Sequence, residues 1–106
     1  MADKIEASHI LIATEDGERS RSKLSAKDAE TKINELKQQL DDGANFADLA
    51  KENSDCPSGS SGGDLGSFGP NDMVSSFGAA AFALEKGETS DVVKTPFGFH
   101  LIHRSG

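Results

Sequence analysis

The chain has 106 residues, of which 35% are hydrophobic and 27% charged, as in a single soluble globular domain spanning residues 1–106. Its formal net charge of −7 argues against a nucleic-acid partner, because phosphate backbones attract basic surfaces. No apolar run approaches the roughly 20 residues of a membrane helix, and residues 1–6 lack the apolar stretch of a signal peptide. Cys56 is the only cysteine, so an internal disulfide is excluded and we expect a reducing compartment, cytosolic or, in a eukaryote, nuclear. We also expect a monomer.

The first element is predicted to be a strand over residues 5–13. Its centre, Ile10-Leu11-Ile12, is an unbroken apolar run with two β-branched residues. Such a run is apolar on both faces, which is typical of a central strand of a sheet. The polar residues 14–24 that follow include Gly17 and several serines, and they predict an exposed loop.

Two helices are expected next. Ser25 and Asp28 fit a helix start pattern, and Gly43 is a plausible stop. Apolar residues at steps of three and four predict one buried stripe, which comprises Ala26, Ala29, Ile33, Leu36 and Leu40. Asn45 and Asp48 then cap a shorter helix, whose core-facing residues would be Phe46, Leu49 and Ala50.

The second half of the chain begins with residues 54–69, which are rich in Gly, Ser and Asp. They predict a long loop of the kind that often carries function, with a candidate short strand at 65–68. An apolar stripe over residues 73–84 predicts a helix that ends at Lys86-Gly87. The last elements are predicted to be strands at 91–94 and 99–104, joined by a turn at 95–98. The order suits a small α+β sheet with helices packed on it.

Two histidines are the first candidates for chemistry. His9 is in the first predicted strand and His100 in the last, and a small sheet can place these strands side by side. Two neutral imidazoles could then hydrogen-bond each other or nearby hydroxyls such as Ser8 and Thr95. The alternative from spacing alone is a buried pair that only holds the sheet together.

Cys56 is the third candidate, because it lies in the polar loop instead of on an apolar face. It is either a small packing residue or a thiol that faces substrate. A carboxylate at Asp55 would raise the thiol pKa if the two groups were close. Four residues could line an apolar pocket or belong to the ordinary core: Leu65, Phe68, Met73 and Phe77.

The sequence shows no cofactor motif. The glycine-rich residues 62–66 lack the Lys-Ser/Thr of a nucleotide-binding loop and would instead allow sharp turns near a shallow cleft. No Cys/His cluster has the spacing of a zinc site. We therefore expect a protein without a metal or cofactor.

The chain resembles the parvulin-type peptidyl-prolyl cis/trans isomerases over about residues 7–104. Six segments carry the resemblance in family order: SHILI at 8–12, NFADLA at 45–50, SDCPS at 54–58, GGDLGSF at 62–68, Met73-Val74 with Phe77, and FGFHLI at 97–102. The resemblance implies an α+β parvulin fold, similar to that of the FKBP proteins. Its four-stranded antiparallel sheet is surrounded by helices in the order one strand, three helices, one strand, one helix and two strands.

The resemblance also implies non-covalent prolyl isomerisation of peptides and proteins, and it assigns site residues. The catalytic group would comprise His9, Cys56, His100 and Thr95. The substrate-binding group would comprise Leu65, Phe68, Met73, Phe77 and Phe97. Phosphoprotein-directed relatives bind phosphate with basic residues after the first strand, so candidate contacts to phosphate or acidic substrates here are Arg19, Arg21 and Lys23. However, Ala13 stands where that subgroup has its first basic residue.

Two other functions remain open from the sequence. One is a module or chaperone that binds proline-containing segments without turnover, since it would use the same apolar pocket. The other is a thiol hydrolase using Cys56 with His9 or His100, although the sequence shows neither a nucleophile turn nor a third orienting group.

Overall fold

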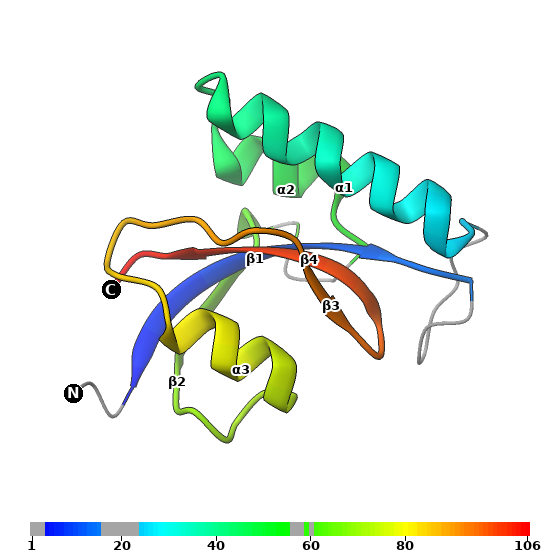
Figure 1. Ribbon diagram of the computed structural model, residues 1–106. Coiled ribbons are helices and arrows are strands. Elements are labelled where there is room, and N and C mark those ends of the chain that lie inside the picture. The colour runs from blue at the N-terminus through cyan, green and yellow to red at the C-terminus, as the bar shows by residue number, and fades with distance from the viewer. Residues whose placement is uncertain (1–3, 16–23, 56–58, 60) are drawn as a thin grey trace.

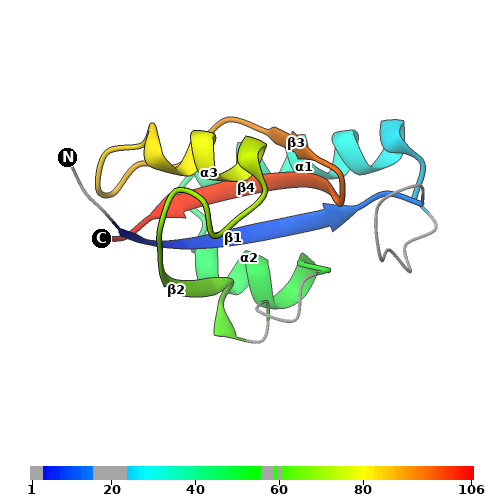
Figure 2. The ribbon, with the colours of Figure 1, turned by 90° about the horizontal axis from the view of Figure 1, so that it is seen from below.

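Four antiparallel strands form one sheet, and helices cover both of its faces (Figure 1). The computed structural model describes residues 4–15, 24–55, 59 and 61–106. The strand order is β2-β1-β4-β3, so β1 (Ile5–Ala13) and β4 (Gly98–Arg104) run side by side through the middle of the sheet (Figure 2). The outer strands are β2 (Asp64–Phe68) and β3 (Val93–Thr95).

Strand β1 contributes buried apolar residues to both faces of the sheet. Ile5 and Ala7 belong to the core cluster on one face, and Ile10 and Ile12 to the cluster on the other. The prediction of a central strand at residues 5–13 is confirmed. The first and last strands are also neighbours as predicted, in a register that runs from Ala7 opposite Arg104 to Ala13 opposite Gly98.

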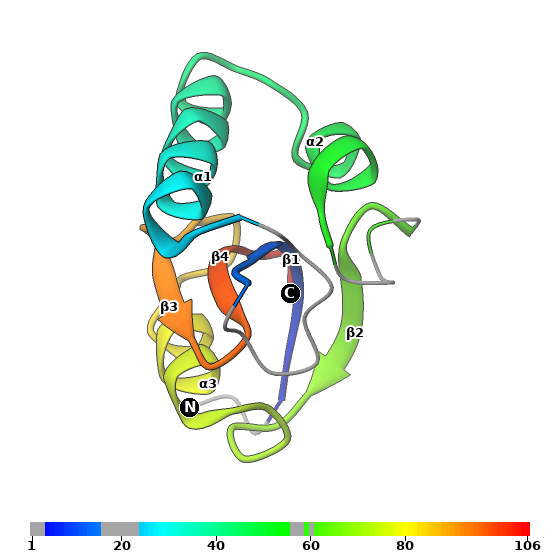
Figure 3. The same cartoon turned by 90° about the vertical axis from the view of Figure 1, so that its right-hand side faces the viewer.

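Helices α1 (Ala26–Asp41) and α2 (Phe46–Asn53) cover one face of the sheet (Figure 3). Both begin where the sequence predicts, because the Ser25 hydroxyl accepts the Asp28 N–H and the Asn45 side chain accepts the Asp48 N–H. The predicted stripe of α1 is buried at Ala29, Ile33 and Leu36 and partly buried at Leu40, whereas Ala26 at its first position is exposed.

Helix α3 (Ser75–Phe82) covers the opposite face and is shorter than the predicted residues 73–84 (Figure 1). It ends before Lys86-Gly87 because its last turn tightens, with the Leu84 N–H bonded to the Ala81 carbonyl. The candidate strand at 65–68 is present as β2, which starts one residue earlier.

The C-terminal hairpin is tighter than the sequence suggests. Strand β3 is shifted from the predicted 91–94, and β4 begins one residue before the predicted 99–104, because Thr95 and Gly98 pair across the turn. Only Pro96 and Phe97 remain as loop residues. Of the three helices expected between β1 and β2, α1 and α2 lie within the described residues; the stretch where a third would fall contains 56–58 and 60, which are outside them.

The sheet separates two hydrophobic cores. The core under α1 and α2 comprises Ile10, Ile12, Ala29, Ile33, Leu36, Leu49, Ala50, Phe99 and Leu101. The core under α3 comprises Ile5, Ala7, Phe68, Phe77, Ala81 and Ile102. Among the described helices, none has the length and apolar character to cross a membrane.

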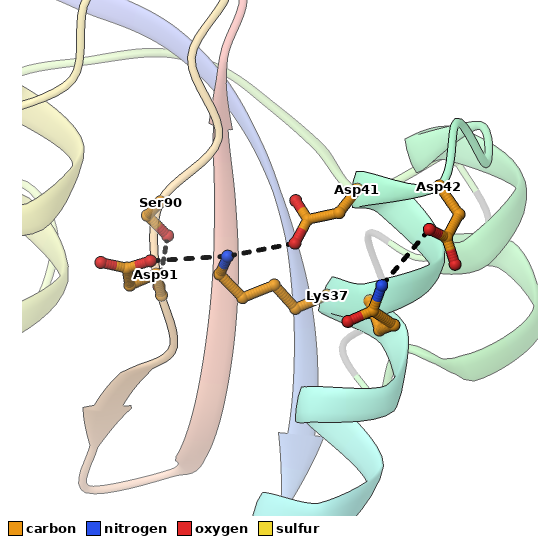
Figure 4. Close-up of polar contacts among 6 residues, drawn as sticks. Lys37, Asp41, Asp42, Ser90 and Asp91 are labelled. Carbon is orange, nitrogen blue, oxygen red and sulfur yellow. Dashed lines mark hydrogen bonds and ion pairs between the residues drawn. The ribbon is translucent and has the colours of Figure 1, made fainter.

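Surface charges add a link between α1 and the segment before β3. The Lys37 ammonium lies 3.6 Å from an Asp41 oxygen and 3.5 Å from an Asp91 oxygen (Figure 4). Both carboxylates are largely exposed, so these ion pairs contribute little to stability. The packing of the two cores therefore carries most of the stability of the fold.

Candidate active site

The two central strands bring His9 and His100 together on the α3 face of the sheet. His9 lies opposite Ile102 and Leu11 lies opposite His100, so the two histidines are diagonal neighbours across the β1–β4 ladder. Their Nδ1 atoms are 3.0 Å apart, and their rings lie nearly parallel with centroids 5.2 Å apart. The predicted contact between the two imidazoles is present.

Both rings are neutral at pH 7. Burial lowers the pKa of His9 from 6.5 to about 4. Burial, with a smaller contribution from the nearby His9, lowers the pKa of His100 to about 3. Since neutral imidazole carries one N–H, the hydrogen bond between the Nδ1 atoms requires a proton on one of them and a lone pair on the other.

Thr95 extends this hydrogen-bonded pair into a chain of three side chains. Its hydroxyl oxygen is 2.7 Å from Nε2 of His100 and also accepts the Phe97 N–H at 3.3 Å. If the shared proton is on His100 Nδ1, the threonine hydroxyl donates to Nε2; if it is on His9, His100 Nε2–H donates to the hydroxyl. The chain can thus reverse its hydrogen bonds without acquiring charge.

Phe77 of α3 forms the apolar wall beside the histidines. Its ring meets His9 at 5.4 Å and His100 at 5.2 Å between centroids, both in edge-to-face geometry. Phe68 packs behind it, 6.1 Å from the Phe77 ring centroid. Both phenylalanines are only 3% exposed, so these two predicted pocket residues are members of the core under α3.

The other predicted substrate-binding residues are more accessible. Leu65 of β2 and Met73, just before α3, are half-buried and pack against the same core. Phe97, in the hairpin turn, is also half-buried, and its backbone N–H bonds to Thr95. The apolar surface near the histidine pair therefore combines buried rings with two partly exposed aliphatic side chains.

The remaining candidates cannot be placed. Cys56, Arg19, Arg21 and Lys23 lie outside the described residues. The described part of the chain has no group of three His, Cys, Asp or Glu side chains able to hold a metal ion.

Gly63 has a role that the sequence reasoning missed. Glycines at 62 and 63 were expected to allow sharp turns, and both have positive φ, at 73° and 82°. The carbonyl of Gly63 also accepts the His9 N–H at 2.9 Å, and a Cβ at position 63 would lie 2.2 Å from the His9 carbonyl oxygen. The close backbone approach at Gly63 thus holds β1 at His9, a contact that only the pairing of β1 and β2 reveals.

Comparisons with known proteins agree with this geometry. The family described as the PPIC-type PPIase domain matches residues 1–105. Peptidyl-prolyl cis-trans isomerase Pin1 of Digitalis lanata is 40% identical over 116 residues, covering 99% of this chain and 98% of that protein. Foldase protein PrsA of Geobacillus kaustophilus is 48% identical over 100 residues, which cover 93% of this chain but 30% of the foldase. The solution structure of TbPIN1 superimposes with a TM-score of 0.90 at 32% identity, covering both chains completely.

Proposed function

The chain belongs to the PPIC-type peptidyl-prolyl cis/trans isomerases, the parvulins, and catalyses rotation about X-Pro bonds; we propose that it does so on the α3 face of its sheet, at the His9–His100–Thr95 chain. The observation that carries this proposal is a buried, uncharged polar network directly beside an apolar wall. A prolyl ring needs the apolar surface, and the adjoining imide needs the polar one.

The reaction requires no bond to be made or broken. Partial double-bond character gives amide rotation a barrier of about 18–20 kcal/mol. In the twisted imide that conjugation is lost and the nitrogen becomes more pyramidal. An enzyme accelerates the rotation by binding the twisted form more tightly than either planar form.

We assign the grip on the proline ring to Leu65, Met73 and Phe77, with Phe68 and Phe97 as aromatic borders. The two half-buried aliphatic side chains can contact a ligand, and the buried Phe77 supplies the wall behind it. Apolar surroundings also disfavour the charge-separated resonance form that keeps the imide planar. One side of the bond is thereby held while the carbonyl side rotates.

The polar groups act on the carbonyl side in this proposal. His100 and Thr95 set the hydrogen bonding there, His9 maintains the network, and Cys56 faces the reacting imide. Because both imidazoles are uncharged, the network stabilises the rotating carbonyl through dipoles and hydrogen bonds instead of a full charge. This favours a non-covalent mechanism.

We further propose that the protein is a cytosolic monomer that acts on proline-containing peptides and proteins. Its turnover does not depend on a phosphate group on the residue before the proline. At the end of β1 the position of Ala13 offers a methyl group, and its backbone N–H is occupied by the Asp55 carboxylate at 2.8 Å. A carboxylate there weakens the local positive potential that a phosphate dianion requires. Matched peptides with Ala, Glu, Ser or phosphoserine before proline test this: a large gain for Glu and phosphoserine would refute it.

The role of Cys56 has its own test. Cys56→Ala should lower kcat/KM in a protease-coupled isomerisation assay, while Cys56→Asp should retain much of the activity, as the resemblance to parvulins with Asp at this position implies. Circular dichroism confirms that each variant is folded. A folded Cys56→Asp protein without activity would contradict the role assigned to this side chain.

A further inference from the structure

The free edge of β1 beyond β2 carries an arrangement that the reaction scheme above does not use. Strand β2 pairs with β1 only between Ile5 and Ser8, and Gly63 extends this contact to His9. Farther along the same edge, no strand of the described residues lies beside the backbone groups of Leu11 and Ala13. Unpaired edge groups in a largely buried strand would be costly.

Ser54 and Asp55 fill this position with three hydrogen bonds. The Leu11 N–H donates to the Ser54 hydroxyl at 3.0 Å, and the Asp55 N–H donates to the Leu11 carbonyl at 2.7 Å. The Ala13 N–H donates to the Asp55 carboxylate at 2.8 Å. The two residues therefore make the hydrogen bonds to β1 that a neighbouring strand would make. Side-chain oxygens of Ser54 and Asp55 take the place of that strand's backbone carbonyls.

This clamp, Ser54 and Asp55 on Leu11 and Ala13, is itself rigidly held. Ser54 caps the C-terminus of α2, since its N–H bonds to the carbonyl of Ala50 at 2.9 Å. Ala50 is completely buried in the core that also contains Ile10 and Ile12 of β1. The clamp thus connects two elements that already pack on each other.

The clamp lies next to a candidate site residue in the sequence. Cys56 is the next residue after Asp55, and consecutive Cα atoms are only about 3.8 Å apart. Gly59, three residues further on, is buried against the same place, since a Cβ there would lie 3.1 Å from Cβ of Ser54. Asp55 and Gly59, the described residues on either side of Cys56 in the sequence, are therefore both anchored, and Asp55 bonds to Leu11, two positions along β1 from His9.

We propose that Asp55 and Ser54 are positioning residues for the isomerase, which fix the origin of the Cys56 segment relative to His9. This inference rests on the role proposed above for Cys56. Asp55 acts through the hydrogen bond to Ala13, so an acceptor at this position matters and its negative charge does not. A side chain held within a fraction of an ångström loses catalytic efficiency when its support is removed, by up to about a hundredfold for a 1 Å displacement.

The experiment compares Asp55→Ala with Asp55→Asn, whose amide oxygen can still accept the Ala13 N–H. We expect Asp55→Ala to lower kcat about tenfold with KM nearly unchanged, and Asp55→Asn to stay within about twofold of the parent protein. Glu88→Ala is the matched control, because this exposed carboxylate also accepts a backbone N–H, that of Glu85, in a different loop. It should leave kcat unchanged.

A double-mutant cycle with Cys56→Ala separates positioning from general loss of structure. If Asp55 acts through Cys56, adding Asp55→Ala to Cys56→Ala causes little further loss of kcat. An equal loss in both backgrounds, or an Asp55→Asn protein as poor as Asp55→Ala, would overturn the inference. Should Asp55→Ala fail to fold, Ser54→Ala takes its place in the cycle with the same expectation.

The cycle also distinguishes failure of the clamp from failure of the proposed site. Full activity in Cys56→Ala would refute the role of the thiol and the inference with it. Impaired Cys56→Ala combined with fully active Asp55→Ala would refute the clamp alone and leave the thiol's role intact.

Discussion

Lowering the pH from 7 to 5 should destabilise this protein through its buried histidine pair. The pKa of His9 is lowered to about 4 and that of His100 to about 3, in both cases mainly by burial. In the unfolded chain both imidazoles have a pKa of about 6.5 and take up protons in this range. The unfolded state then binds more protons than the folded state, so stability is complete above about pH 6.5 and falls as the pH approaches the folded-state values.

The size of the effect follows from the same pKa values. One pKa unit corresponds to about 1.4 kcal/mol, and pH 5 lies about 1.5 units below the unfolded-state pKa, so each histidine costs about 2 kcal/mol. The pair therefore removes about 4 kcal/mol, from a total stability that is typically about 5–15 kcal/mol for a domain. Carboxylates contribute less in this window, because their ordinary pKa values are about 3.9 and 4.3.

Urea unfolding at pH 7, 6 and 5 measures this loss. Circular dichroism is the suitable signal, because the chain has neither Trp nor Tyr. His100→Gln should lose about half of the pH dependence. A decrease below about 1 kcal/mol between pH 7 and pH 5 in the parent protein would refute the assignment of both rings as buried and neutral.

Three further pairs of substitutions test other parts of the site. Thr95→Val should lose about 1–3 kcal/mol of stability in urea titrations, since it leaves a buried imidazole nitrogen unpaired, while Thr95→Ser should restore most of it; equal stability of the two would count against the hydrogen bond. Phe77→Ala should cost about 3–5 kcal/mol because this ring is in the core, whereas the half-buried Met73→Ala should weaken peptide affinity with a smaller loss of stability, and the reverse pattern would exchange their roles. Gly63→Ala should be far more destabilising than Gly66→Ala, because both have positive φ but only the first would place a Cβ against backbone; similar thermal midpoints would contradict the close approach.

Much of the fold follows from local patterns in the sequence. The apolar run at Ile10-Leu11-Ile12 predicts a strand buried on both faces, and that is the position of β1. The caps at Ser25 and Asn45 mark helix starts because their side chains compensate for missing backbone acceptors within a few residues. These signals are local, so no knowledge of the rest of the chain is required.

Features set by distant contacts are less accessible. The start of β3 depends on how the hairpin at Pro96 and Phe97 closes, which apolar periodicity does not encode. Pairing of His9 with His100 could be expected from the strand order, but not the diagonal register that places both Nδ1 atoms together.

The contacts that hold the candidate site in place also depend on residues far apart in the sequence, so local patterns do not predict them. Ser54 and Asp55 read as ordinary loop residues until the unpaired edge of β1 is known. The sequence therefore names the candidate side chains, whereas the structure shows what holds those that it describes.

The most direct measurement is an NMR titration of protein carrying ¹⁵N-labelled histidine with an Ala-Pro peptide at pH 7. The three histidines provide an internal control, because His103 faces the α1 and α2 side, where its ring contacts Phe46. We predict neutral-imidazole nitrogen shifts for His9 and His100 that move on binding, with His103 unaffected. Protonated rings at the first two positions, or a response confined to His103, would contradict an isomerase site on the α3 face.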